Sequence, residues 1–155
     1  MSKVRVAVLR GGLSDEYQVS LWTGATVLEN IDKNVFEPID VIISKTGEWL
    51  LNGKVHLPEH ILQSVDVVFN ALHGFYGEDG TLQRVLERHG VPYTGSKPFP
   101  SNIAMNKVLT KNFLKNTDVK VAPHVHVTQD SLNDIGRVAE KITDTFGPQY
   151  FIKPV

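Results

Sequence analysis

Nearly continuous apolar runs, rich in β-branched residues, recur along the first part of the chain. They predict strands that are buried on both faces at 4–9, 39–43 and 65–69. The first and third runs lead through glycine-rich loops into amphipathic stretches. Because strands alternate with helices at this spacing, the pattern predicts an α/β fold, an open and mainly parallel sheet with helices on both faces.

The amphipathic stretches carry start and stop signals. Ser14 is placed to cap a helix whose first turn holds two acids, with an apolar face made of Val19, Trp22, Leu28 and Ile31. A second helix is predicted around Leu82, Val85 and Leu86, with a stop at Gly90. Between these helices, Asn52-Gly53 separates the short runs 49–51 and 55–57, which predicts a β-hairpin with a type I′ turn.

A change in composition at 95–100 predicts a boundary between two domains, 1–97 and 98–155. Beyond it, Ser101 is placed to cap a helix with Met105, Leu109 and Phe113 on one face. A longer helix is predicted from Leu132 to Phe146, and strands are predicted at 124–127 and 149–154. Because the last strand begins where the sequence ends, we expect the chain to be a fragment of a longer protein.

Composition narrows the classes of function. The 155 residues are 41% apolar and 21% charged with no Cys, which is typical of a globular protein and leaves out disulfides, thiolate catalysis and Cys-based zinc sites. Sixteen Lys and Arg balance seventeen Asp and Glu without a basic stripe, so nucleic acid is not an expected partner. No apolar run reaches the roughly 18 residues of a membrane span, and no signal peptide is evident, so we expect a cytoplasmic protein without a membrane partner.

The loop from Gly11 to Glu16, between the first strand and the first helix, is one candidate site. Backbone N–H groups at a helix start favour anions, but two adjacent glycines lack the spacing of a dinucleotide-binding loop, and Asp15 and Glu16 would repel a phosphate. A carboxylate at such a turn is better suited to holding an ammonium group. The alternative is that Glu16 only caps the helix.

The loop His73-Gly-Phe-Tyr-Gly-Glu-Asp-Gly80 is the second candidate, because it follows a buried strand directly. Loops at the carboxyl ends of parallel strands line the ligand crevice of open α/β sheets. His73 could donate to a bound carboxylate or a developing oxyanion, and the glycines would allow close approach of the backbone. In the alternative interpretation His73 is structural, and Glu78 or Asp79 caps the following helix.

Two lysines complete the candidates. Lys107 lies off the apolar face of its predicted helix, where a lysine is normally solvated. Lys153 stands among Tyr150, Phe151 and Ile152, and an ammonium buried there needs an anionic partner such as phosphate, unless it reaches water. His124 and His126 share one side of a predicted strand without a third metal ligand nearby, which favours surface alternation.

Together these segments resemble the N-terminal part of the D-alanine-D-alanine ligases, members of the ATP-grasp group. The resemblance rests on five motifs in the family's order, at 6–21, 69–83, 90–96, 104–107 and 152–154. It implies a Rossmann-like, pre-ATP-grasp first domain, followed by the first part of an α+β ATP-grasp domain. It also implies a homodimer formed through the first domain.

The family's reaction joins two D-alanines with ATP and Mg2+, through an acyl phosphate, for peptidoglycan synthesis. By resemblance, Glu16 is the catalytic candidate that holds the ammonium of the first D-alanine, with Val19 and Ser20 beside it. His73 and Gly74 correspond to the segment near that substrate's carboxylate, and Lys107 and Lys153 to lysines that contact ATP phosphates. Glu78 and Asp79 are expected to organise the loop. The family's Mg2+ ligands correspond to positions beyond Val155, so the 155 residues alone are expected to be inactive and to hold no metal.

Three positions depart from the family's pattern. Gln18 and Asn106 stand where the family has acids, and Arg84 stands where it has a small residue. Gln18 removes a charge near Glu16, and Arg84 adds bulk beneath the loop that carries His73. These departures leave open a related ligase whose second substrate is D-lactate or D-serine. An alternative from another class is a free-standing module that binds a small amino acid or a nucleotide without chemistry.

Overall fold

The computed structural model describes residues 2–155, which form two compact units. One unit ends at Met105 and the other spans Asn106–Val155, and each is described by itself. No helix of residues 2–155 is long and apolar enough to cross a membrane.

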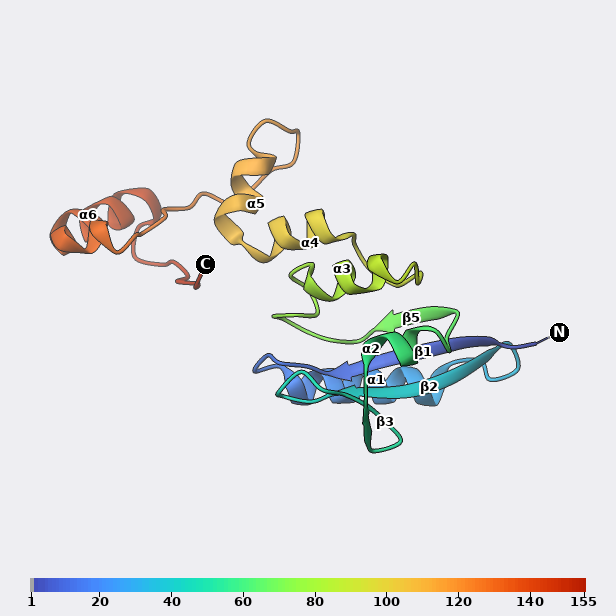
Figure 1. The fold of residues 1–155 in the computed structure, drawn as a ribbon. Helices are drawn as coiled ribbons and strands as arrows, with labels where there is room; N and C mark the ends of the chain where they lie inside the picture. Colours follow the sequence, from blue (N-terminus) through green and yellow to red (C-terminus); the bar gives the residue numbers. More distant parts are fainter. Residues whose placement is uncertain (1) are drawn as a thin grey trace. The chain divides into compact units, whose positions relative to one another are not determined.

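The first unit is built on a five-stranded mixed sheet (Figure 1). Its strands are ordered β4-β3-β2-β1-β5, and their bounds are Val4–Gly11 for β1, Phe36–Ile43 for β2, Trp49–Leu51 for β3, Lys54–His56 for β4 and Val67–Asn70 for β5. The three strands β2, β1 and β5 run parallel, as the apolar runs predict, and β3 and β4 add an antiparallel edge. The predicted hairpin is confirmed, because Asn52 and Gly53 have φ values of 52° and 73°, which a type I′ turn requires.

Side chains of β1 alternate between two apolar cores. Val6 and Val8 face α1 (Tyr17–Asn30), whereas Ala7 and Leu9 face α2 (Pro58–Leu62) and α3 (Thr81–Arg88). All four side chains are at most 4% exposed, which is why β1 reads as a continuous apolar run. The predicted placement of helices on both faces of the sheet is therefore confirmed (Figure 1).

The buried face of α1 agrees with the predicted one in part, since Leu28 and Ile31 pack against the core that contains Val6 and Val8. Val19 and Trp22 are 46% and 63% exposed, and the fully buried positions are Ser20 and Gly24. A Cβ on Gly24 would lie 2.6 Å from the Cβ of Arg10, whose guanidinium donates to both carboxylate oxygens of Asp40 at 2.7 and 2.6 Å. Because the Arg10 side chain occupies the sheet surface under the middle of α1, a residue larger than glycine does not fit at position 24.

The Arg5–Asp66 pair links β1 to the residue before β5, and it makes stability depend on pH. Arg5 donates from its guanidinium and its backbone N–H to Asp66, which lowers the pKa of that carboxyl. Above the ordinary aspartate pKa of about 3.9, the ionised Asp66 stabilises the fold. This stabilisation is lost as the pH falls through the lowered pKa that Asp66 has in the folded state. We expect Asp66→Asn to lower the free energy of unfolding at pH 7, and the difference from wild type to vanish in acid.

Urea unfolding followed by tryptophan fluorescence measures this effect, because Trp22 and Trp49 both belong to the first unit. Asp15→Asn, at an exposed position of the same unit, is the matched control. A difference between Asp66→Asn and wild type that stays constant from pH 7 into acid would contradict the assignment.

The predicted helix from Ser101 to Phe113 is two helices. The first, α4 (Pro98–Met105), belongs to the first unit, and a Cβ on Gly80 at the start of α3 would come within 2.5 Å of the Pro98 carbonyl oxygen. The second, α5 (Lys107–Leu114), starts after Asn106, whose backbone is extended and whose side chain accepts from the N–H groups of Val108 and Leu109 at 3.0 and 2.9 Å. Asn106 therefore ends one helix and caps the next. The division of domains after residue 97 stays a prediction.

The second unit also contains η1 (Asp130–Asp134) and α6 (Ile135–Phe146), which ends at Gly147 as predicted. The predicted strands at 124–127 and 149–154 are wrong: both segments are irregular. A strand needs a partner for its backbone hydrogen bonds, and Asn106–Val155 contains no β-ladder. The apolar stripe of η1 and α6 stays on the surface, since Leu132 and Ile135 are 43% and 69% exposed.

Candidate functional site

The candidate site lies where the chain leaves two neighbouring parallel strands. The loop after β1 leads to α1 on one face of the sheet, and the loop after β5 leads to α3 on the other face. At such a topological switch point the two loops diverge and leave a crevice at the carboxyl ends of the strands. The two loops singled out in the sequence, Gly11–Glu16 and His73–Gly80, are the loops that meet here.

The loop after β1 contacts its neighbour through Ser14 and Glu16. Helix α1 begins at Tyr17, so Ser14 is not its cap, contrary to the sequence prediction, and the Ser14 hydroxyl donates to the His73 carbonyl oxygen at 2.6 Å. Glu16 occupies the N-cap position without a capping hydrogen bond from its side chain. Its Oε2 lies against Gly74, where an added Cβ would come within 2.7 Å of it. The exposed carboxylate of Glu16 is therefore placed beside the second loop.

Ser20 ties the ends of the two strands together from inside. Its side chain is 0% exposed, its hydroxyl accepts from the Gly11 N–H at 2.8 Å, and it donates to the Ala71 carbonyl oxygen at 2.8 Å. Both hydrogen-bonding functions of the hydroxyl are thus used by backbone groups. Ser20 fixes the spacing of the two loops and faces away from solvent.

The loop after β5 is held in shape by its own polar side chains. Asn70 donates to the Gly77 carbonyl oxygen and accepts from the Leu72 N–H. Glu78 Oε2 accepts from the Gly74 N–H at 2.7 Å, and Asp79 accepts from the N–H groups of Tyr76 and Thr81 at 3.1 and 2.8 Å. These bonds offset the backbone strain of the turn, in which Tyr76 has a φ of 73°.

Tyr76 anchors the same loop in the core. Burial raises the pKa of its hydroxyl, and a hydrogen bond from Trp49 opposes that shift. Tyr76 packs against the core cluster that includes Leu82 and Leu86. Tyr76 therefore anchors the middle of the loop in the core, and His73 is the first residue of the same loop.

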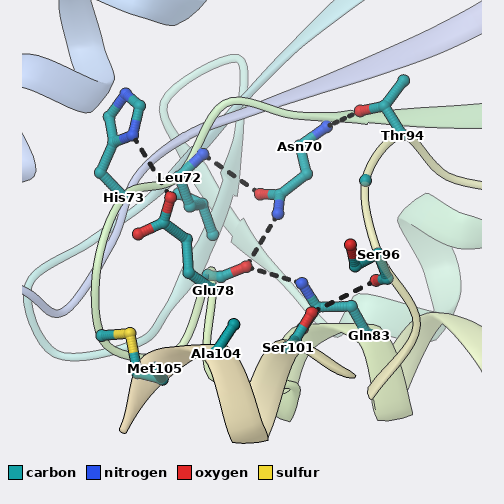
Figure 2. Close-up of a pocket in the computed structure, with 12 residues that line it drawn as sticks. Asn70, Leu72, His73, Glu78, Gln83, Thr94, Ser96, Ser101, Ala104 and Met105 are labelled. Carbon is teal, nitrogen blue, oxygen red and sulfur yellow. Dashed lines mark hydrogen bonds and ion pairs between the residues drawn. The ribbon is translucent and has the colours of Figure 1, made fainter. Parts of the chain in front are cut away.

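His73 lies between the two loops with a partner at each ring nitrogen. Its Nε2 is 2.8 Å from the Thr23 hydroxyl of α1, and its Nδ1 is 3.9 Å from Glu78 Oε1. Figure 2 shows Nδ1 directed at Glu78, and the His73 side chain is 30% exposed. The imidazole is held in place while one edge of the ring still faces an open space.

That open space is a cleft of about 450 Å³ between the loop after β5, residues 94–96 and α4 (Figure 2). His73, Glu78, Ala104 and Met105 are among the residues that line it. Gln83 closes the floor and donates to the Gly77 carbonyl oxygen at 2.8 Å, while its Oε1 is buried without a partner among residues 2–155. The cleft is large enough for a small polar molecule.

The two lysines lie in the second unit. Lys107 is the first residue of α5 and is exposed. Lys153 is also exposed, beside Phe151 and Ile152 at 95% and 86% exposure, which agrees with the alternative in which its ammonium reaches water. The cause of this exposure is the missing strand at 149–154, because an unpaired segment cannot enclose a side chain.

The departures from the family's pattern have mild consequences here. Gln18 is exposed on α1. Arg84 is exposed on α3, with Nη2 3.3 Å from the Thr81 hydroxyl, so its bulk lies in solvent and not beneath the loop. Asn106 caps α5 through its side-chain oxygen, which an aspartate could also do.

Sequence reasoning missed three residues of the site: Ser14 as a contact to His73, Asn70 as a brace of the loop, and Thr23 as the partner of the imidazole. A signal for Thr23 was available. It lies seven residues after Glu16, so the helical period places both on the same face of α1. Within residues 2–155, no three His, Asp or Glu side chains gather in a way that could hold a metal ion.

Comparison with known proteins gives the family. Residues 5–61 and 54–96 match the model described as "D-ala D-ala ligase N-terminus". A D-alanine-D-alanine ligase of Clostridium acetobutylicum is 36% identical over 98% of this chain and 50% of its own length. The chain thus spans about half the length of the curated relatives it matches.

Solved structures agree with this match. The D-alanine-D-alanine ligase from Coxiella burnetii is 25% identical with a TM-score of 0.76, over 91% of this chain and 49% of that one. The VanG D-Ala:D-Ser ligase from Enterococcus faecalis is 27% identical with a TM-score of 0.69, over 94% of this chain and 50% of that one. The loops that meet at the switch point, 11–16 and 73–80, both lie within the matched residues 5–96, and the chain belongs to the family of the D-alanine-D-alanine ligase N-terminus.

Proposed function

We propose that this chain serves an ATP-dependent ligase that joins two D-alanines through an acyl phosphate, for peptidoglycan precursor synthesis. The observation that carries the proposal is that Glu16, an anion, lies against the loop that carries His73, a hydrogen-bond donor. The Glu16 carboxylate lies against Gly74, and the imidazole of the preceding residue, His73, is held beside an open cleft. An amino acid carries an ammonium and a carboxylate on one carbon, and these two side chains offer a partner for each.

The surroundings of Glu16 support a small apolar amino acid as the first substrate. Val19 is 46% exposed one helical turn after Glu16 and offers an apolar contact for a methyl group. Ser20, which the family resemblance placed near the substrate, has its hydroxyl committed to Gly11 and Ala71. We therefore assign Ser20 a positioning role, and we assign Glu78 and Asp79 the support of the loop.

Lys107 and Lys153 are proposed to contact the phosphates of ATP. Both ammonium groups are exposed, and Lys107 stands at the N-terminus of α5, where the helix dipole also favours a phosphate. We propose that Mg2+ takes part together with ATP, and we assign none of its ligands to residues 2–155. The proposal therefore divides the work: the first unit holds D-alanine and the second unit contributes to ATP binding.

The experiment measures phosphate released from ATP, with and without D-alanine, by the protein expressed from the complete reading frame that encodes this chain. We expect release that depends on D-alanine, and we expect Glu16→Gln to raise the KM for the first D-alanine about 10- to 100-fold, since it removes a charge-assisted hydrogen bond. Glu29→Gln, at an exposed position on the same helix, is the matched control. Binding of D-alanine without phosphate release would instead identify a binding module. Unchanged kinetics in Glu16→Gln would show that Glu16 does not bind the substrate and only occupies the N-cap position of α1.

A different second substrate is the second candidate, favoured by the likeness to the VanG D-Ala:D-Ser ligase. Glu16 and His73 are assigned to the first substrate, so both candidates share the site described above. Offering D-alanine, D-serine and D-lactate together and identifying the product by mass spectrometry separates them.

A further inference from the structure

Thr23 contacts His73 in a way that no sequence motif indicated. The Thr23 hydroxyl lies 2.8 Å from His73 Nε2, and it is also 3.1 Å from the Val19 carbonyl oxygen one turn earlier in α1. A hydroxyl has one hydrogen to donate and two electron pairs to accept with. It can therefore donate to Nε2, or it can donate to Val19 and accept a hydrogen from Nε2.

The surroundings of Nδ1, the other ring nitrogen, favour one of these two arrangements. Glu78 Oε1 lies 3.9 Å from Nδ1, while Glu78 Oε2 is held by the Gly74 N–H at 2.7 Å, so the carboxylate cannot turn away. A bare electron pair on Nδ1 would face this negative charge. A hydrogen on Nδ1 removes that repulsion.

We propose that Thr23 is a positioning residue: together with Glu78 at the other ring nitrogen, its hydroxyl keeps a hydrogen on His73 Nδ1, on the edge of the ring that faces Glu78, in both charge states of the ring. When His73 is neutral, Thr23 donates to Nε2 and the hydrogen resides on Nδ1. When His73 is protonated, Thr23 donates to Val19 and accepts from Nε2, with no heavy atom moved. The same edge of His73 therefore presents a donor to a carboxylate ligand in either state.

This inference rests on the proposed function for its consequence, since the carboxylate would be that of the first D-alanine. A substrate carboxylate in the cleft would receive the Nδ1 hydrogen that otherwise faces Glu78. The hydroxyl of Thr23 suits this task because it both donates and accepts, which a lysine or a backbone amide in its place would not do.

The test reads the tautomer directly by long-range ¹H–¹⁵N correlation spectra of the 155-residue chain, at a pH well above the ordinary histidine pKa. His73→Gln assigns the His73 signals among the six histidines. We expect the Nδ1–H form to dominate in wild type and in Thr23→Ser. Thr23→Val removes the donation to Nε2 but keeps Glu78 beside Nδ1, so we expect it to increase the share of the Nε2–H form. Thr26→Val is the matched control, because Thr26 lies on the same helix and its hydroxyl likewise donates one turn back, to Trp22.

The outcomes separate this inference from the proposed function. An Nε2–H form in wild type, or an unchanged tautomer in Thr23→Val, overturns the role of Thr23 whatever the protein catalyses. If the complete protein releases phosphate with D-alanine, Thr23→Val should raise the KM for the first D-alanine about three- to tenfold with kcat little changed, and Thr23→Ser should restore it. Absence of ligase activity leaves the tautomer result standing and removes only its consequence for substrate binding.

Discussion

A Gly74→Ala variant is expected to lose tight binding of the first substrate while keeping its fold. The added Cβ would meet Glu16 Oε2 at 2.7 Å and the Ser14 side chain at 3.1 Å, so the flexible carboxylate has to leave its place. Gly74 also has a φ of 69°, where a residue with a Cβ costs about 1–2 kcal/mol. We expect the KM for the first D-alanine to rise at least about tenfold in the complete protein, which corresponds to about 1.4 kcal/mol of lost binding.

Gly53→Ala is the matched control for this variant. Gly53 has nearly the same φ, 73°, but nothing lies within 4 Å of its added Cβ, and it belongs to the β3–β4 turn. Both variants should lose about 1–2 kcal/mol of unfolding free energy, and only Gly74→Ala should change the KM. Equal kinetics in the two variants would show that the position of the Glu16 carboxylate does not matter for binding.

The first unit was largely predictable because its signals are local. The run Val4–Leu9 is apolar at nearly every position, which only a strand covered on both faces requires, and Asn52-Gly53 defines its turn by backbone conformation alone. The sequence order also has the loops 11–16 and 73–80 each follow a strand of the parallel sheet, and the carboxyl ends of parallel strands share one edge. The order of strands and helices in the sequence determines at which edge of the sheet each loop lies. The position of the site therefore follows from the topology.

The failures have a common physical origin in long-range contacts. The exposed Trp22 and the buried Gly24 cannot be told apart by helical spacing, because the Arg10–Asp40 pair that crowds Gly24 comes from two strands. The strands predicted at 124–127 and 149–154 have suitable residues but no neighbour among residues 106–155 to pair with. Local propensity proposes a strand, and a hydrogen-bonding partner is needed to form one.

Ser20 shows the same limit at the site and carries the largest expected effect on stability. By resemblance to the family, Ser20 is expected near the substrate, whereas its burial follows from packing between β1, α1 and the end of β5. We expect Ser20→Ala to lower the unfolding free energy of the first unit by about 2–4 kcal/mol, since it leaves the Gly11 N–H and the Ala71 carbonyl group without this partner in the interior. Urea unfolding monitored by the fluorescence of Trp22 and Trp49 measures it.

Ser2→Ala, at an exposed position ahead of β1, is the matched control and should leave the unfolding midpoint unchanged. A loss in Ser20→Ala of less than about 0.5 kcal/mol, the lower end of the range for one hydrogen bond, would contradict the bridging role. The same variant distinguishes a role of Ser20 in supporting the two loops from direct contact of Ser20 with the substrate. If Ser20 acts only by holding the two loops, its loss should shift binding of D-alanine in proportion to the disorder of residues 11–16 and 71–80, which amide hydrogen exchange on the same variant reports.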